Sequence, residues 1–142
     1  MYILDTDHIS QLESLSTSPE AQRLRFRLAG LKPEEWITTI ITFEEQVRGW
    51  MAYLAKARLP EQQVKAYSRL KGVLNHYLKI TVLEFDEAVA AEFERLKQAR
   101  VRIGTMDLRI AAIALTHNAT VLTRNIVDFG QVPDLRVEDW RV

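Results

Sequence analysis

Short apolar runs alternate with longer segments of helical periodicity along this chain. The apolar runs predict strands at residues 2–4, 36–41, 80–83 and 120–123, and residues 135–137 are a candidate for a fifth strand. Strands that alternate with helices are typical of βα units packed on a mostly parallel sheet. The pattern therefore predicts an α/β fold built around four or five strands.

Helix signals occupy the segments between these strands. Ser18 and Pro19 are typical residues of a helix start, and Gly30 is a typical end. A second group of helical signals predicts an antiparallel helical hairpin at about residues 43–79, with apolar residues at helical spacing in its second arm at Val64, Tyr67, Leu70, Leu74 and Leu78. Further helices are expected at residues 86–100 and 106–117. Since we find no linker or repeat, we expect one domain over residues 1–142.

Composition and charge narrow the function classes. The chain has 142 residues, of which 47% are hydrophobic, so it can bury a core without metals or disulfides. Its 19 basic and 19 acidic residues cancel, so any nucleic-acid contact must depend on local patches. The absence of cysteine excludes thiolate metal sites and Cys nucleophiles. Without a signal sequence or an apolar run of roughly 20 residues, the chain is expected to be cytoplasmic, with no membrane contact.

Acidic residues follow the ends of the predicted strands. In an open parallel sheet, ligands bind just beyond the carboxyl ends of the strands. Asp5 comes directly after the first strand, Glu44 and Glu45 follow the second by one helical turn, and Asp128 lies just past the fourth. Asp107 instead begins the helix that precedes the fourth strand, so its place beside the other acids is the least secure.

Carboxylates gathered in one site repel one another by about a few kcal/mol. A bound divalent cation removes this repulsion, and Mg²⁺ and Mn²⁺ prefer oxygen ligands. Such an ion lowers the pKa of bound water and stabilises the charge that develops on a phosphate under attack. The acids therefore indicate metal-dependent phosphodiester hydrolysis.

Most of these acids, although not Asp5, also have a purely structural interpretation. Thr42 and Glu45 have the spacing of a capping box, and Asp7 is a candidate N-cap for a helix through Leu12. Asp107 suits the first turn of a helix whatever its chemistry, and Asp128 suits a loop turn. The histidines share no ligand spacing and are interpreted as surface or partly buried residues: His8, His76 and His117.

Four segments, in order and spanning nearly the whole chain, resemble the motifs of PIN-domain ribonucleases, specifically the VapC toxins of toxin–antitoxin pairs. Leu4-Asp5-Thr6-Asp7 resembles the N-terminal motif, and residues 42–49 resemble a T-x-x-E-(x)3-G segment that selects Glu45 over Glu44. Residues 103–112 resemble the D-x-x-I-A-A helix, and residues 123–129 resemble T-x-N-x-x-D-F. Gln46 departs from the pattern, because the family often has an apolar residue there.

The resemblance implies a three-layer α/β/α sandwich, a homodimer, and an endoribonuclease dependent on Mg²⁺ or Mn²⁺ and held inactive by an antitoxin protein. It also assigns catalytic roles to Asp5, Glu45, Asp107 and Asp128, of which the first three are expected to bind the metal. Thr6, Thr123 and Asn125 are expected to support these acids.

Basic residues gather near the third of these motifs. From Glu94 to Arg109 there are only two acids but five cations, which are Arg95, Lys97, Arg100, Arg102 and Arg109. We interpret Arg102, Arg109 and Arg124 as contacts for RNA phosphates, preferably of a single-stranded or looped RNA. The alternative is that they are solvated charges on helix surfaces.

Two other functions fit parts of the sequence. Asp5 and Asp7 also resemble the D-x-D motif of haloacid-dehalogenase phosphatases, although Ile9 stands where that family has Thr or Val, and a late acidic pair is missing. A non-catalytic module is the second alternative, in which the helical hairpin recruits a partner and the acids hold a structural cation. Metal-dependent RNA cleavage distinguishes both from a ribonuclease.

Overall fold

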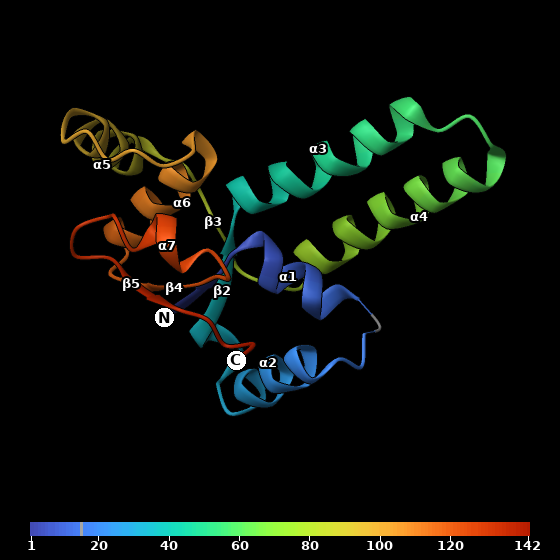
Figure 1. Cartoon of the computed structure of the whole chain (residues 1–142), viewed down its shortest axis with the longest axis horizontal. Coiled ribbons are helices and arrows are strands. Elements are labelled where there is room, and N and C mark those ends of the chain that lie inside the picture. The colour runs from blue at the N-terminus through green and yellow to red at the C-terminus, as the bar shows by residue number, and fades with distance from the viewer. Residues whose placement is uncertain (15) are drawn as a thin grey trace.

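The computed structural model describes residues 1–14 and 16–142, which are built around a sheet of five strands. The sheet order is β3-β2-β1-β4-β5, and every neighbouring pair is parallel (Figure 1). The strands are β1 (Tyr2–Leu4), β2 (Trp36–Thr39), β3 (Val82–Leu83), β4 (Thr120–Leu122) and β5 (Arg136–Glu138). This arrangement confirms the predicted parallel sheet and includes the candidate fifth strand.

Helices cover both faces of the sheet and make the fold a three-layer α/β/α sandwich. In Figure 1, α5 and α6 lie above the sheet, α1 and α2 lie below it, and α3 and α4 project to one side as a hairpin. The helices are α1 (Thr6–Glu13), α2 (Pro19–Ala29), α3 (Ile40–Lys56), α4 (Pro60–Tyr77), α5 (Glu87–Gln98), α6 (Thr105–Thr116) and α7 (Ile126–Phe129). A short 3-10 helix, Pro33–Glu35, precedes β2. Among the described residues, we find no helix with the length and hydropathy needed to cross a bilayer.

The alternation of side chains along the strands separates two hydrophobic cores. Ile3 of β1 and Val121 of β4 are paired in register and face the core that includes α5 and α6. The next residues, Leu4 and Leu122, face the opposite core with α1, α2 and α4. Because successive side chains of a strand point to opposite faces, even these three-residue strands contribute to both cores.

Two helix starts differ from the sequence-based prediction. β2 ends at Thr39, two residues earlier than predicted, and the Thr39 hydroxyl accepts a hydrogen bond from the amide of Thr42 at 3.1 Å. Thr42 is therefore not the N-cap of α3, and Glu45 is not part of a capping box. Likewise, Asp5 rather than Asp7 caps α1. Both helices begin directly at the strand end, which brings their first turns to the carboxyl edge of the sheet.

The predicted hairpin forms from α3 and α4. The face of α4 that packs, however, is not the face that carries most of its large apolar side chains. Ala66, Val73 and Tyr77 are the buried residues of α4. Most of the stripe predicted to pack is instead exposed: Val64, Tyr67, Leu74 and Leu78. Both stripes have helical spacing, so periodicity alone does not distinguish the packed face from the exposed one.

Candidate active site

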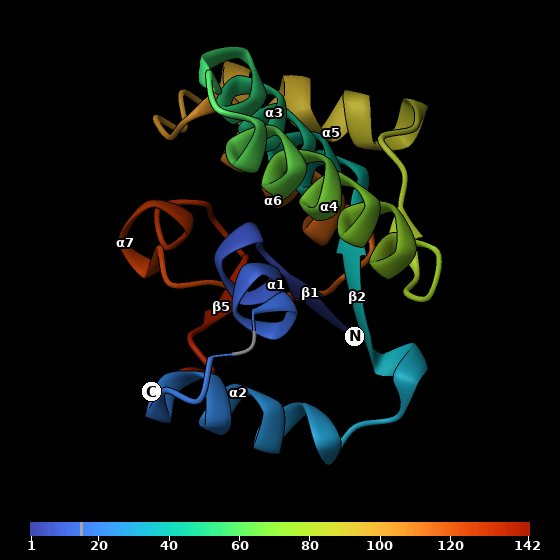
Figure 2. The same ribbon diagram turned by 90° about the vertical axis from the view of Figure 1, so that its right-hand side faces the viewer.

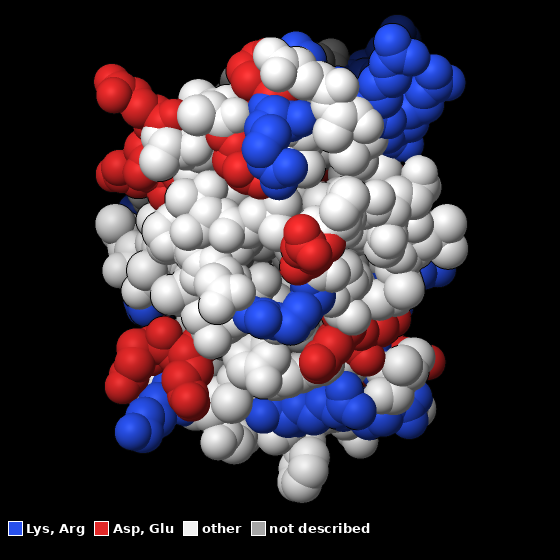
Figure 3. Space-filling view, turned by 90° about the vertical axis from the view of Figure 1, so that its left-hand side faces the viewer, with Lys and Arg blue, Asp and Glu red and all other residues white. Residues whose placement is uncertain are grey.

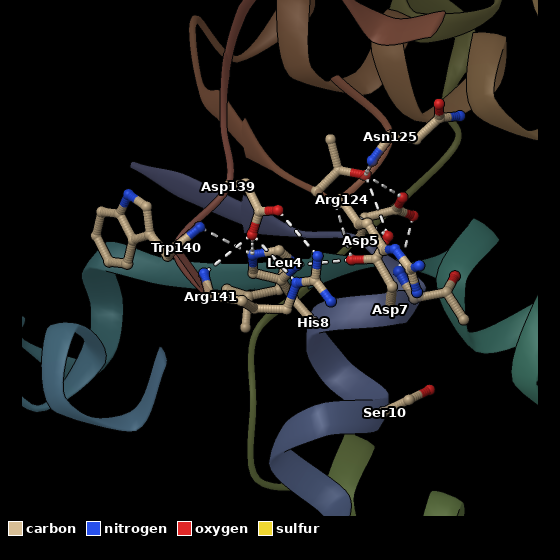
Figure 4. A network of polar contacts seen from close by, with 12 residues as sticks. Leu4, Asp5, Asp7, His8, Ser10, Arg124, Asn125, Asp139, Trp140 and Arg141 are labelled. Atoms are coloured by element: carbon tan, nitrogen blue, oxygen red, sulfur yellow. Dashed lines mark hydrogen bonds and ion pairs between the residues drawn. The ribbon is translucent and has the colours of Figure 1, made fainter. Parts of the chain in front are cut away.

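The carboxyl ends of β1 and β4 meet at Asp5. Its backbone amide donates to the carbonyl oxygen of Leu122 at 2.9 Å, which extends the pairing of the two strands by one residue. Its carboxylate accepts hydrogen bonds from the Thr6 amide at 2.7 Å and from the Thr123 hydroxyl at 2.8 Å. Only 6% of Asp5 is exposed. The acid is thus held in one orientation at the centre of the sheet edge (Figure 4).

Thr6 joins Asp5 to the second predicted acid. Its hydroxyl donates to Oε1 of Glu45 at 3.1 Å, across from α1 to α3. Because α3 starts immediately after β2, Glu45 lies less than two helical turns from the strand end. Asp5, Thr6 and Glu45, which lie far apart in sequence, therefore share one side of the sheet edge.

Asn125 joins the remaining two acids. Its Nδ2 donates to Asp107 at 3.2 Å and to Asp128 at 3.0 Å, so a single amide bridges the first turn of α6 and the short helix α7. The Asn125 backbone amide donates to the Thr123 hydroxyl at 3.0 Å. Through Thr123, this pair is connected to Asp5, so the four predicted acids belong to one hydrogen-bonded cluster. Asp107 lies in this cluster although it precedes its strand.

Burial and like charges shift the acid equilibria of this cluster. Burial raises the pKa of Asp5 to about 7, with further contributions from the charges of Asp7 and Asp107. Hydrogen bonds from Thr6 and Thr123 act in the opposite direction. Burial also raises the pKa of Glu45 and that of Asp107, the former with repulsion from Asp107 and the latter with repulsion from Asp128. The carboxylates therefore act on one another even where no hydrogen bond joins them.

Asp7 is a fifth acid of the cluster, although the sequence motifs did not place it among the catalytic acids of the proposed ribonuclease. Its carboxylate accepts hydrogen bonds from the backbone amide of Arg124 at 3.1 Å and from the Thr123 hydroxyl at 3.3 Å. Its charge raises the pKa of Asp5, Glu45 and Asp107. The signal in the sequence was its position two residues after Asp5, in the first turn of the helix that leaves the strand end.

His8 holds Asp7 in place and is fully buried, so its interpretation as a surface or partly buried residue was wrong. The distance from His8 Nδ1 to Asp7 Oδ1 is 2.6 Å, and the Trp140 amide donates to Nε2 at 3.2 Å (Figure 4). With Nε2 accepting from the Trp140 amide, Nδ1 is the nitrogen that donates to Asp7. The imidazole thereby connects the end of the chain to the acidic cluster and is not free to bind a metal.

The three predicted RNA-contacting cations occupy two places. Arg102 and Arg109 line a hollow of about 540 Å³ between α5 and α6, together with Phe93, Lys97 and Arg100. Arg124 follows β4, and its backbone contacts Asp7. On the molecular face shown in Figure 3, basic and acidic side chains are interspersed, in keeping with the zero net charge. Their contact with RNA stays a prediction.

The acids do not form a closed set of metal ligands as they stand. Within residues 1–14 and 16–142, no three His, Cys, Asp or Glu side chains are grouped closely enough to hold an ion. The donors Thr6, Thr123 and Asn125 instead lie between the carboxylates and satisfy part of their hydrogen-bonding capacity. Binding a shared cation therefore requires some carboxylates to turn away from these donors.

Comparisons with known proteins identify the family. A family model described as the PIN domain matches residues 2–135. The chain is 28% identical to ribonuclease VapC1 of Haemophilus influenzae strain R2866, covering 99% of this chain and 98% of that protein. It is 26% identical to the tRNA(fMet)-specific endonuclease VapC of Salmonella typhimurium strain LT2, covering 98% and 97%. The solved structure of VapBC-1 from nontypeable Haemophilus influenzae aligns with a TM-score of 0.74 at 25% identity, over 99% of this chain and 98% of that one. The chain therefore belongs to the PIN-domain family, and the relatives that it matches over its full length are named as a ribonuclease and an endonuclease of the VapC type.

Proposed function

We propose that this protein is the toxin of a toxin–antitoxin pair and that it hydrolyses RNA with a divalent cation, Mg²⁺ or Mn²⁺. The observation that carries the proposal is the cluster at the carboxyl edge of the sheet, which contains Asp5, Glu45, Asp107 and Asp128. These carboxylates come from the N-cap or the first two turns of four separate helices, and the side chains of Thr6, Thr123 and Asn125 donate hydrogen bonds to them.

The chemistry of the cluster fits a hard divalent cation. Its ligands are oxygen atoms, as Mg²⁺ and Mn²⁺ prefer, and the only imidazole beside it among the described residues, His8, is occupied at both nitrogens. The pKa of Asp5 is raised to about 7, so the ionised form is costly until a positive charge is nearby. Asp5, Glu45 and Asp107 are the residues that would hold the ion. When bound, it would neutralise charge on the phosphate and activate water.

The remaining residues orient these groups. Thr123 and the Thr6 amide hold the Asp5 carboxylate from two sides, and Asn125 holds Asp107 and Asp128. Asp128, which is not among the three acids that would hold the ion, would orient the attacking water. Water forms a new bond to phosphorus and the bond to O3′ breaks, which leaves a 5′-phosphate and a 3′-hydroxyl without a covalent enzyme intermediate. Thr6, Thr123 and Asn125 are therefore positioning residues.

Cleavage of RNA by the purified protein tests this function. Wild type is expected to cut RNA with Mg²⁺ or Mn²⁺ and to stop in EDTA, and Asp5→Asn is expected to lose the activity. Glu92→Gln is a matched control, because Glu92 pairs with Arg95 on α5 outside the cluster. Equal cleavage by wild type and Asp5→Asn would reveal a contaminating nuclease and contradict the proposal.

The phosphatase alternative finds no support. The PIN model matches residues 2–135, and the Asp7 carboxylate, which the alternative needs as an acid–base group, is engaged by His8, Thr123 and the Arg124 amide. Trapping an aspartyl-phosphate analogue on Asp5 with beryllofluoride would revive that alternative. We expect no adduct.

Two protein partners complete the proposal: an antitoxin and a second copy of this chain. The structural relative is a VapBC-1 complex, and α4 exposes apolar side chains at Val64, Tyr67, Leu74 and Leu78. Contiguous apolar patches on a protein surface commonly mark contacts with other proteins. Light scattering is expected to give a dimer for wild type and a monomer for Leu74→Asp. Val127→Asp is the control, because Val127 is also exposed but lies on α7. An unchanged dimer in Leu74→Asp would exclude α4 as the dimer contact.

A further inference from the structure

A groove of about 1030 Å³ leads away from the candidate catalytic acids between α1, α3 and α4. Thr6 and Glu45 of the acidic cluster line it, and so do Trp50 and Tyr53 farther along α3. Figure 2 shows these three helices on the same side of the molecule. A polymer bound at the acids therefore has a continuous path into this groove.

Two glycines line the walls of the groove, Gly49 on α3 and Gly72 on α4. A glycine inside a helix costs about 1 kcal/mol relative to alanine. A Cβ atom added at either position would meet no described atom within 4 Å, so packing does not require glycine there. Their effect is to leave bare backbone on two facing helices, which a flat ligand can approach closely.

Two buried polar atoms at the groove lack partners. Glu13 Oε1 and His76 Nε2 have no hydrogen-bond partner among the described residues and lie 4.0 Å apart. The other oxygen of Glu13 accepts from Gln46 at 3.0 Å, and Gln46 in turn accepts from the Tyr77 hydroxyl at 2.7 Å. This chain of hydrogen bonds engages one oxygen of Glu13 and leaves the other oxygen without a partner. Burial lowers the pKa of His76, so its imidazole is neutral near pH 7 and can donate or accept.

Three cations complete the groove. The Lys65 ammonium lies 5.5 Å from the centre of the Tyr53 ring, and the Arg69 guanidinium lies 5.9 Å from that of Trp50. Lys79 also lines the groove. All three cations are exposed, so they can bind negative groups without a large desolvation cost. The groove thus combines exposed positive charge with a lining that contains both apolar and polar side chains.

We propose that this groove is a nucleotide subsite for the RNA substrate, adjacent to the bond that is cut. A base lies between Gly49 and Gly72, and its edge, once either side chain rotates, hydrogen-bonds to Glu13 and His76. Lys65, Arg69 and Lys79 contact the phosphates. The assignment rests on the proposed ribonuclease function and adds to it the part of the molecule that selects the base.

Nucleotide chemistry matches the groove better than a peptide does. The edge of a nucleobase presents a donor beside an acceptor, as one carboxylate oxygen and one neutral imidazole nitrogen require. The base is flat, and its backbone carries one negative charge for each nucleotide. The groove also begins at the residues proposed to cut RNA, so that a bound strand passes through both.

Binding of a fluorescein-labelled single-stranded RNA in EDTA, followed by anisotropy, tests the subsite without cleavage. Gly72→Leu fills the groove and is expected to raise the Kd about tenfold, the effect of losing one bound base. Gly72→Ala is the matched control and is expected to bind nearly as wild type. Circular dichroism and thermal melting verify that both variants are folded.

Charge and base selection provide two independent readouts. Lys79→Ala is expected to lower the slope of log Kd against log salt concentration by about 0.7, whereas Lys71→Ala, exposed on α4 outside the groove, leaves it unchanged. Glu13→Gln replaces one carboxylate oxygen by an amide donor. It is expected to change the order of affinities among RNAs that differ in a single base.

The outcomes separate this subsite from the ribonuclease function. If wild type neither binds nor cuts RNA, the proposed function itself fails. If wild type cuts RNA but Gly72→Leu and Glu13→Gln bind it with unchanged affinity and base order, only the subsite is refuted. If Gly72→Leu retains RNA affinity but loses binding to the antitoxin encoded by the neighbouring gene, the groove serves the protein partner and the proposal is overturned.

Discussion

Replacing Asp5 by Asn is expected to stabilise the metal-free protein at pH 8 while abolishing cleavage. Asn has the shape of Asp without its charge. Its oxygen can still accept from the Thr6 amide, and its amide group can donate to the Thr123 hydroxyl oxygen. The substitution therefore removes a buried charge and leaves no new cavity.

The magnitude follows from the shifted acid equilibrium of Asp5. The pKa is 3.8 for the unperturbed group and about 7 in the folded protein. Because each pKa unit corresponds to about 1.4 kcal/mol, ionised Asp5 lowers the free energy of unfolding by about 4 kcal/mol at most. The folded state binds this proton more tightly than the unfolded state does. Stability is therefore highest below about pH 4 with respect to this group, falls as the pH rises, and levels off above about pH 7.

Urea unfolding in EDTA between pH 4 and pH 8.5, followed by tryptophan fluorescence, measures this effect. The free energies of unfolding of wild type and Asp5→Asn are expected to diverge as the pH rises, with the variant more stable at pH 8. Glu92→Gln is the control for the sign of the pH dependence, because the hydrogen bond from Arg95 lowers the pKa of Glu92, whereas burial raises that of Asp5. A difference that does not depend on pH, or a variant less stable than wild type at pH 8, would refute the reasoning. Adding Mn²⁺ should stabilise wild type more than the variant.

Three further substitutions probe the groups around the acids. Thr123→Val removes the hydroxyl that joins Asp5 to Asn125 and should reduce cleavage about 10- to 100-fold, measured with a fluorogenic RNA at saturating metal. Asn125→Ala should raise the Mn²⁺ concentration for half-maximal cleavage, because Asp107 and Asp128 lose their common donor; an unchanged metal dependence would speak against this role. His8→Ala should cost about 2–4 kcal/mol in urea unfolding, because it leaves Asp7 and the Trp140 amide unpaired and opens a cavity; a loss below about 1 kcal/mol would contradict the contacts of the buried ring.

Local signals in the chain were sufficient for most elements of the fold. The Ser18 cap, the proline that follows it and the Gly30 end define α2 as predicted, because caps act within one helical turn. The short apolar runs became strands of a parallel sheet because they alternate with helices. Local rules were weaker where one residue suits two roles: Thr42 was a plausible cap, but the chain turns into α3 already at Thr39.

The sequence by itself determined which acids follow the strand ends, namely Asp5, Glu44 or Glu45, and Asp128, since the carboxyl edge of a parallel sheet brings such positions together; the family resemblance then selected Glu45. Only the tertiary structure decided that Asp7 belongs to the cluster, through a histidine and a tryptophan amide more than a hundred residues apart. It also decided which stripe of α4 is packed. The place of Asp7 and the packed face of α4 both depend on long-range contacts, and neither is encoded in the spacing of neighbouring residues. Burial, which raises the pKa of Asp5, is likewise a property of the tertiary structure.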